Sequence, residues 1–371
     1  MAAPSTTSEA TAAASPAPAS RPSRDYLSCL QAYRGLAAVA VLLFHVGKLF
    51  KTKLGVDLAC APFFHAGYLG VDFFFVLSGF IILYTNAHSI GNPLAARKYF
   101  YRRVTRIYPV FLSVCLLKLV FMLAGGSVSE GKMDFSRILA SLLLVPQADV
   151  PLVDVAWTLS FEMAFYTFFL LLIVCGAALW RVVVLHALMV VLVNLPGLPP
   201  LQFPSSFVFS PFFLEFYLGC LACHLVMRRA WSIGTALTAL WAGLVLVLMG
   251  YLGYSDFLPW NRPHGELFRA VFWGTACSVL VFGSVSLGPG FDRRIPWLLR
   301  TLGDASYSVY LMQGTFIILC LSCLASLNFN SVPYAGWLAL AVGSIALIGS
   351  YIYYLVVEKT LLSFCRRRTP K

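Results

Sequence analysis

Apolar blocks of similar length recur along the whole chain, and this repetition constrains the fold more than any other feature. A helix needs ~20 mostly apolar residues to cross a bilayer. Ten blocks approach or reach that length, and Gly, Pro and charged residues separate them. The sequence therefore predicts an all-α polytopic membrane helix bundle of about ten transmembrane helices. The predicted spans are 30–50, 67–84, 106–124, 155–175, 178–195, 207–227, 232–253, 268–286, 305–324 and 335–357.

The composition excludes a soluble globular protein. Hydrophobic residues make up 60% of the 371 residues and charged residues only 11%, whereas soluble domains carry roughly 25% charged residues. The net charge of +12 does not indicate nucleic-acid binding, because the aromatic residues lie inside the apolar blocks rather than among the basic residues. We therefore expect a membrane protein with no nucleic-acid partner.

The distribution of lysine and arginine over the loops predicts the orientation in the membrane. Loops rich in these residues stay in the cytoplasm. Of the 27 basic residues, 18 fall on the side that holds both termini and seven on the other side, so both termini are predicted to be cytoplasmic. We divide the chain into a disordered cytoplasmic tail (1–24), a transmembrane domain (25–360) and a basic cytoplasmic tail (361–371). The first tail is rich in Ala, Ser, Thr and Pro and cannot bury a core. The apolar segment 138–147 is too short to cross and is expected to lie at the interface.

The cysteines do not predict a metal site. Two pairs, Cys220/Cys223 and Cys320/Cys323, have the CxxC spacing, but both lie in apolar stretches. No second ligand pair follows at a spacing typical of zinc. We interpret these cysteines as small helix-packing residues and expect no metal.

Arg34 and His45 lie inside the first predicted span and are eleven residues apart. Eleven residues make close to three helical turns, so both side chains point to one face, about 16 Å apart along the axis. Ionisable residues inside a membrane are costly and indicate a functional site by default. The alternative is that Arg34 extends to the cytoplasmic surface while His45 makes a hydrogen bond between helices.

Two carboxylates are expected in the outer half of the membrane, at a depth similar to that of His45. Asp72 lies five residues from the outer start of the second span, and Glu162 lies seven residues into the fourth. Asp72 could orient or charge His45, as carboxylates do in other acid–base sites. Capping or packing is the alternative for Asp72, and Glu215 in the sixth span reaches a comparable depth.

Basic residues gather on the cytoplasmic side before the third span. Arg103 and Arg106 are three residues apart, so they share a helix face and suit phosphate binding. The bias of cytoplasmic loops toward positive charge would also explain them. The chain lacks a GxSxG elbow, a Walker loop and an HExxH motif, and a base without a protein nucleophile favours direct transfer to a substrate hydroxyl.

Five segments in this order resemble the acyltransferase 3 family, over essentially the whole membrane domain. They are Arg34-Gly35 to His45, the GVDFFFVLSGF segment (70–80), Arg103-x-x-Arg106-Ile107-Tyr108-Pro109, WTLSFE (157–162) and LGDASYSVYL (302–311).

The resemblance implies a ten-helix enzyme of the bacterial inner membrane. It would transfer an acyl group, usually acetyl from cytoplasmic acetyl-CoA, to a carbohydrate hydroxyl. His45 matches the family's catalytic histidine, Glu162 its carboxylate in the fourth span, and Arg34, Arg103 and Arg106 its donor-binding arginines. The chain departs from the family at Gln313, where a histidine is common, and it resembles the short form without a hydrolase-like domain.

These observations lead to one hypothesis and two rivals. In the hypothesis, the arginines hold acyl-CoA, and His45 deprotonates a hydroxyl of a carbohydrate or lipid-linked saccharide. Asp72 or Glu162 tunes the basicity of His45. A variant of this mechanism passes through an acyl-histidine intermediate. A transporter or flippase would use the same charged residues as a proton relay, and an assembly subunit of an export complex would need none of them. Outer-loop residues Trp260, Asn261 and His264 are candidate sugar contacts or interfacial residues that contact membrane lipid.

Overall fold

The computed structural model describes residues 28–58, 60–123, 134–253, 265–326 and 334–367. Every regular element in these residues is helical, and no strand is present among them. The predicted all-α class is therefore confirmed. The tail 1–24 and the candidate sugar contacts Trp260, Asn261 and His264 lie outside the described residues.

Nine helical segments in the described part of the chain are long and apolar enough to cross a membrane. They coincide with nine of the ten predicted spans, and the protein is an integral, multi-pass membrane protein. The segments and their main helices are α1 (Ser28–Leu54), Phe63–Ser89 with α3 (Gly70–Asn86), Pro93–Leu123 with α4 (Ala96–Leu123), Asp154–Cys175 with α6 (Trp157–Cys175), Ser205–Arg228 with α9 (Phe212–Arg228), α10 (Ile233–Gly253), α11 (Gly265–Ser286), α13 (Trp297–Ser326) and Ala335–Cys365 with α14 (Ala335–Tyr353).

The tenth predicted span is a shorter apolar segment, Ala177–Val193, which contains α7 (Trp180–Val193). It begins after Gly176, whose φ of 80° ends the preceding helix, and it ends at Asn194. A helix of this length extends about 25 Å, whereas the hydrocarbon core is about 30 Å thick. The cytoplasmic location of both termini requires an even number of crossings and stays a prediction.

Two shorter helices lie at the ends of spans. The segment 138–147, predicted to be too short to cross, overlaps α5 (Phe135–Leu142), which begins after Asp134. The Asp134 carboxylate accepts a hydrogen bond of 2.8 Å from the backbone N–H of Arg137, and this bond holds the pKa of Asp134 below its ordinary value. The predicted C-terminal tail is in part helical, because α15 (Lys359–Arg367) continues the last span.

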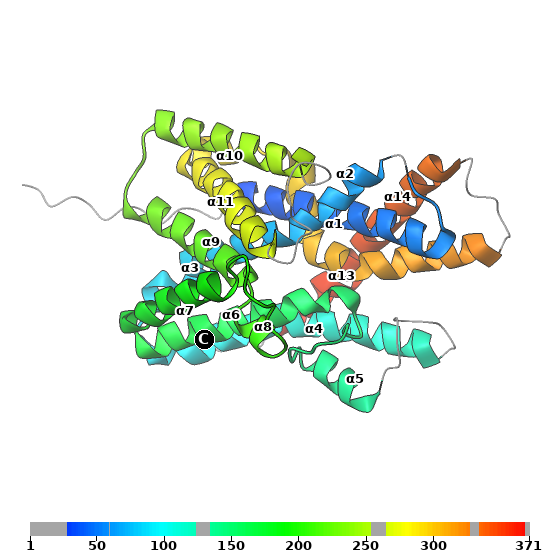
Figure 1. The fold of residues 1–371 in the computed structure, drawn as a ribbon, viewed down its shortest axis with the longest axis horizontal. Coiled ribbons are helices and arrows are strands. Elements are labelled where there is room, and N and C mark those ends of the chain that lie inside the picture. Colours follow the sequence, from blue (N-terminus) through cyan, green and yellow to red (C-terminus); the bar gives the residue numbers. More distant parts are fainter. Residues whose placement is uncertain (1–27, 59, 124–133, 254–264, 327–333, 368–371) are drawn as a thin grey trace, which may run out of the picture.

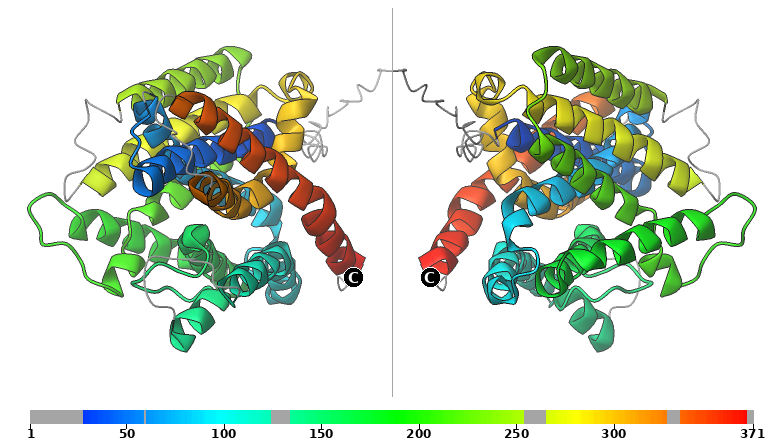
Figure 2. Two further views of the ribbon diagram at one scale, coloured as in Figure 1. Left: turned by 90° about the vertical axis from the view of Figure 1, so that its right-hand side faces the viewer. Right: turned by 90° about the vertical axis from the view of Figure 1, so that its left-hand side faces the viewer.

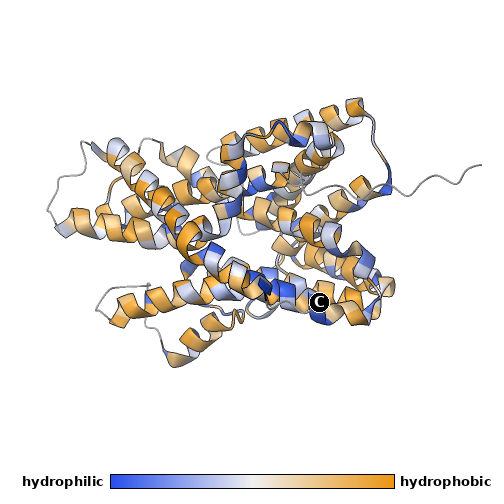
Figure 3. Ribbon diagram, turned by 180° about the vertical axis from the view of Figure 1, so that it is seen from behind, coloured by the Kyte–Doolittle hydropathy of each residue, from blue (hydrophilic) through white to orange (hydrophobic). Residues whose placement is uncertain are grey.

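The helices form two groups that α3 and α9 connect (Figure 1). One group contains α1, α10, α11, α13 and α14, and the other contains α4, α5, α6 and α7. Helix α9 contacts α3 and α11 as well as α6 and α7, so it belongs to both groups. Figure 2 shows the same division from either end of the molecule. Hydrophobic residues cover most of the long helices (Figure 3), as expected for helices that face lipid or pack on one another.

Glycines allow two of the helix pairs to approach closely. A Cβ atom on Gly303 of α13 would overlap the backbone carbonyl of Gln31 on α1. On α3 and α9, a Cβ atom on Gly79 would overlap the carbonyl of Phe216 in the same way. Small residues at helix crossings are the usual way to bring backbones together in membranes. The first crossing places the Arg34 segment of α1 against α13.

The last span contains a π-helical turn, Tyr354–Glu358, between α14 and α15. Such turns occur frequently at functional sites. Glu358 is only 1% exposed, and its Oε2 accepts a hydrogen bond of 2.5 Å from the Ser308 hydroxyl of α13. The turn therefore directs a carboxylate from the end of the last span into the protein.

Candidate active site

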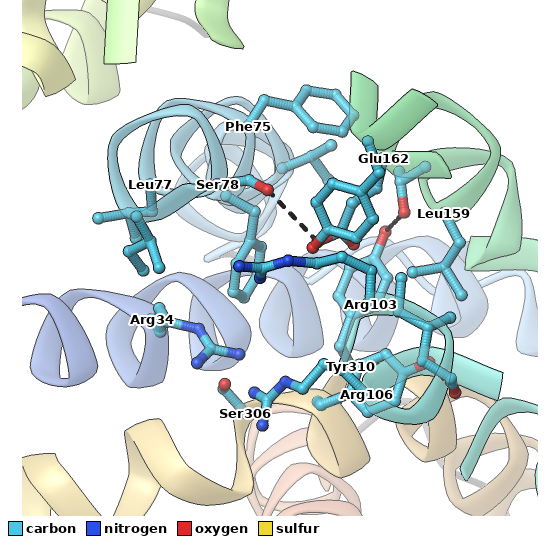
Figure 4. Close-up of a pocket in the computed structure, with 17 residues that line it drawn as sticks. Arg34, Phe75, Leu77, Ser78, Arg103, Arg106, Leu159, Glu162, Ser306 and Tyr310 are labelled. Carbon is cyan, nitrogen blue, oxygen red and sulfur yellow. Dashed lines mark hydrogen bonds between the residues drawn. The ribbon is translucent and has the colours of Figure 1, made fainter. Parts of the chain in front are cut away.

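A cavity of about 140 Å³ lies where five of the helices meet (Figure 4). Its polar side chains include three arginines, one glutamate and several hydroxyl groups, and apolar side chains complete its wall. The lining residues are Arg34 of α1; Val71, Phe74, Phe75, Leu77, Ser78 and Ile81 of α3; Arg103, Arg106 and Ile107 of α4; Thr158, Leu159, Glu162 and Tyr166 of α6; and Ser306, Tyr307 and Tyr310 of α13.

The three arginines come from two helices that are distant in the sequence. Arg34 and Arg106 point toward one another next to Ser306, and Arg103 extends over the other side of the cavity (Figure 4). Arg103 and Arg106 share a helix face, as their spacing of three residues requires. The structure thus brings together all three residues that the sequence predicted to bind a negatively charged donor.

The arginines make few interactions that would neutralise their charge. Arg34 Nη1 donates to the Gln31 side chain over 3.2 Å, and Arg103 Nη2 donates to the Thr85 hydroxyl over 3.3 Å. No carboxylate in the described residues lies within the 4.0 Å of an ion pair with any of the three. Guanidinium groups bind phosphate and carboxylate oxygens through paired hydrogen bonds. The cavity therefore suits a ligand with several negative charges.

Glu162 is held in place by two hydroxyl groups of the cavity wall. Its Oε1 accepts hydrogen bonds from Ser78 of α3, at 3.3 Å, and from Tyr166, one turn further along α6. The Arg103 guanidinium lies over the Tyr166 ring, 5.4 Å from its centre. Glu162 and Arg103 thus interact with the same tyrosine, one through its hydroxyl and the other through its ring.

His45 lies on the same continuous helix as Arg34 but outside the residues that line the cavity. Its Nδ1 is 2.9 Å from the Val41 carbonyl of the preceding turn. A carbonyl only accepts, so Nδ1 carries the hydrogen and the neutral ring keeps its lone pair on Nε2. No hydrogen bond to Nε2 is present within the described residues. The ring therefore has the tautomer that a general base acting through Nε2 requires.

Asp72 does not approach His45, which corrects the expected pairing of these two residues. Its Oδ1 is 3.1 Å from Arg269 Nε of α11, and its side chain is fully buried. The sequence predicted that Asp72 and His45 lie at a similar depth in the membrane, but it did not reveal how α3 is rotated about its axis. That rotation turns Asp72 toward α9 and α11, whereas Ser78 on the same helix faces the cavity.

The charged groups that surround His45 are Lys48, Lys118 and Asp154. Lys118 of α4 is 7% exposed, and its Nζ is 3.9 Å from Asp154 Oδ1. Sequence reasoning missed this pair, although an intramembrane lysine is an available signal. It also missed Glu358, whose charge interacts with Arg34 and Arg106.

The described residues contain no cluster of three or more His, Cys, Asp or Glu side chains that could hold a metal ion. Gln313, where the family often has histidine, is fully buried on α13, and its amide has no hydrogen-bond partner among the described residues.

Comparisons with known proteins identify relatives along most of the chain. The profile of a family described as an acyltransferase domain matches residues 27–355. The chain is 29% identical over 319 residues to the exopolysaccharide production protein ExoZ of Rhizobium meliloti strain 1021, and the match covers 82% of this chain and 92% of that protein. It is 26% identical over 375 residues to the acyltransferase MdmB of Streptomyces mycarofaciens, which covers 93% and 94% of the two chains. No solved structure matches.

Proposed function

Because the chain belongs to the acyltransferase 3 family, we propose that it is an O-acyltransferase of the bacterial inner membrane that moves an acyl group from cytoplasmic acyl-CoA to a carbohydrate hydroxyl. Acetyl-CoA is the proposed donor. The relative ExoZ carries exopolysaccharide production in its name, so a polysaccharide or its lipid-linked precursor is the proposed acceptor, with exopolysaccharide preferred to lipopolysaccharide.

The observation that carries this proposal is the group of three arginines around one cavity. Arg34, Arg103 and Arg106 line it, and no carboxylate lies within ion-pair distance of them in the described residues. The phosphate groups of acyl-CoA supply the missing negative charge. From Arg34 the thioester arm extends along α1 toward His45, a distance of about 16 Å for eleven helical residues.

In the transfer step, an ester bond forms between the acyl carbon and the acceptor oxygen, and the thioester bond breaks. His45 Nε2 takes the proton of the acceptor hydroxyl and passes it to the departing thiolate, so that no net proton is released. General-base catalysis of this kind contributes about 10²- to 10⁴-fold. Glu162 stays with its hydroxyl partners and balances part of the arginine charge. Asp72 takes no part in the step, because it is paired with Arg269.

The test is the acetyl content of surface polysaccharide from cells that produce the wild type or His45→Ala as their only copy, with equal protein levels in the membrane. We expect the variant to lose at least about 100-fold in initial rate of acetylation. His224→Ala is the matched control, because His224 is exposed on α9 and lies outside the cavity lining. Unchanged acetylation by His45→Ala would contradict the base assignment and favour a transporter instead.

A further inference from the structure

Three ionisable side chains lie buried together outside the cavity, between α3, α9 and α11. Asp72 and Glu215 are each 0% exposed, and Arg269 is 7% exposed. None of them lines the cavity. We refer to Asp72, Arg269 and Glu215 as the buried triad.

The packing of the three helices leaves space for these side chains and excludes water from them. A Cβ atom on Gly274 of α11 would lie 3.2 Å from Glu215 Cγ, so a larger residue there would press on the glutamate. The close approach of α3 and α9 at Gly79 brings the helices of Asp72 and Glu215 together. The guanidinium of Arg269 lies over the rings of Tyr68 and Phe212, at 5.0 and 5.1 Å from their centres.

The hydrogen bonds of the triad are incomplete without one more proton. Asp72 Oδ1 accepts from Arg269 Nε at 3.1 Å. Asp72 Oδ2 and both carboxyl oxygens of Glu215 have no donor among the described residues. The carboxyl group of Glu215 nevertheless lies beside that of Asp72. Two ionised carboxylates cannot form a hydrogen bond with each other, because both only accept.

The charges of the triad lead to the same conclusion. Two carboxylates and one guanidinium carry a net charge of minus one, and a buried uncompensated charge is strongly unfavourable. Arginine stays protonated in proteins, and its one ion pair among the described residues is with Asp72, at 3.1 Å. Neighbouring carboxyl groups relieve such a conflict by sharing a proton. The other titratable groups that face the triad are Tyr68, Cys277 and Glu266.

We propose that Glu215 is protonated and donates a hydrogen bond to Asp72 Oδ2, and that the resulting neutral triad positions Arg269 against Tyr68. The effect reaches the proposed active site through aromatic contacts. The Tyr68 ring lies 5.5 Å from Phe44, which contacts His45 at 5.1 Å, and it stacks on Trp157 at 6.5 Å. The triad is thus a proton-binding site in the membrane that positions the aromatic residues beside His45.

The protonated state is tested by infrared spectroscopy of the full-length protein in lipid nanodiscs. A neutral carboxylic acid has a carbonyl stretch that an ionised carboxylate lacks, and it shifts in deuterated water. We expect this band in the wild type, its loss in Glu215→Gln, and its retention in Glu266→Gln, which makes the same change at an exposed residue of α11. A wild type without the band, or a Glu215→Gln variant with an unchanged band, would overturn the proposal.

Thermal unfolding distinguishes the protonated carboxyl group of Glu215 from the ionised one of the ion pair. Glutamine replaces a protonated glutamic acid with a similar donor, so Glu215→Gln should keep the wild-type melting temperature. Asp72→Asn removes the charge that compensates Arg269, and the yield of folded protein should fall severely. Equal damage from both substitutions would show that Glu215 is ionised and contradict the proposal.

The positioning role is tested with Arg269→Lys, which keeps the charge but loses the planar group that stacks on Tyr68. We expect folded protein whose acyl transfer is reduced severalfold while its affinity for coenzyme A is unchanged. Since coenzyme A binding is measured separately, a failure here leaves the proposed function standing. Wild-type transfer by Arg269→Lys would refute the positioning role.

Discussion

The membrane domain holds three arginines around a cavity and a fourth, Arg269, outside it, and the two settings differ in how the charge is balanced. Arg34, Arg103 and Arg106 line a cavity and have no carboxylate at ion-pair distance among the described residues. Arg269 is more completely buried and holds Asp72 at 3.1 Å. The residue type is the same in both settings, and the partners differ.

The difference teaches that the partner of a buried arginine, rather than its burial, separates a binding site from a structural one. A paired guanidinium has its hydrogen-bonding capacity used within the protein. An unpaired one costs stability until a ligand supplies negative charge. Four substitutions or conditions sharpen this contrast.

The largest effect is expected for Arg269→Met. It leaves Asp72 buried without its partner, which costs about 3–5 kcal/mol of unfolding free energy. Chemical denaturation in detergent measures the loss. The double variant Asp72→Asn/Arg269→Met carries no such charge and should recover most of the stability. A single variant as stable as the wild type would mean that the triad is not a structural ion pair.

Arg106→Ala is expected to weaken donor binding without loss of stability. Hydrogen bonds to charged groups contribute about 1.5–3 kcal/mol each, so the dissociation constant of coenzyme A should rise roughly 10- to 150-fold. Titration calorimetry on purified protein gives this value. Arg102→Ala is the matched control, because Arg102 is an exposed neighbour outside the cavity. Loss of folded protein in Arg106→Ala would make this arginine structural as well.

Tyr166→Phe removes one of the two hydroxyl groups that donate to Glu162 but keeps the ring beneath Arg103. A hydrogen bond of this type contributes about 1 kcal/mol, so kcat/KM should fall about fivefold. Steady-state kinetics with acetyl-CoA checks the change, and Tyr108→Phe, outside the cavity, should have no effect. An effect of several orders of magnitude would assign Tyr166 a direct chemical role.

Ionic strength should produce the smallest effect. Salt screens accessible charges strongly and buried pairs much less. Raising the salt concentration should therefore weaken coenzyme A binding severalfold and leave the melting temperature unchanged. A melting temperature that falls with salt would indicate that water reaches the triad.

The sequence was sufficient for the fold class and for the three arginines that line the cavity. Nine of the ten predicted spans coincide with long apolar helices, because length and hydropathy are local properties. Arg103 and Arg106 share a face because three residues separate them, and this relation is local too.

The sequence was not sufficient for relations that depend on how each helix is rotated and what it contacts. Asp72 and His45 have similar depths, but α3 turns Asp72 toward Arg269, 197 residues away in the chain. Lys118 and Asp154 come together only through the packing of α4 against the start of α6. Glu358 reaches Ser308 because of a π-helical turn, for which the sequence has no clear signal.

The continuity of α1 from Ser28 to Leu54 makes this helix a molecular ruler. Arg34 and His45 lie on one continuous helix, so the helical rise sets the distance between them. This distance does not depend on how the other helices are arranged. In the proposed function, a donor whose arm is too short to span this distance does not bring its thioester to His45. One residue inserted between them would lengthen the ruler by about 1.5 Å and rotate its two ends by about 100° relative to each other.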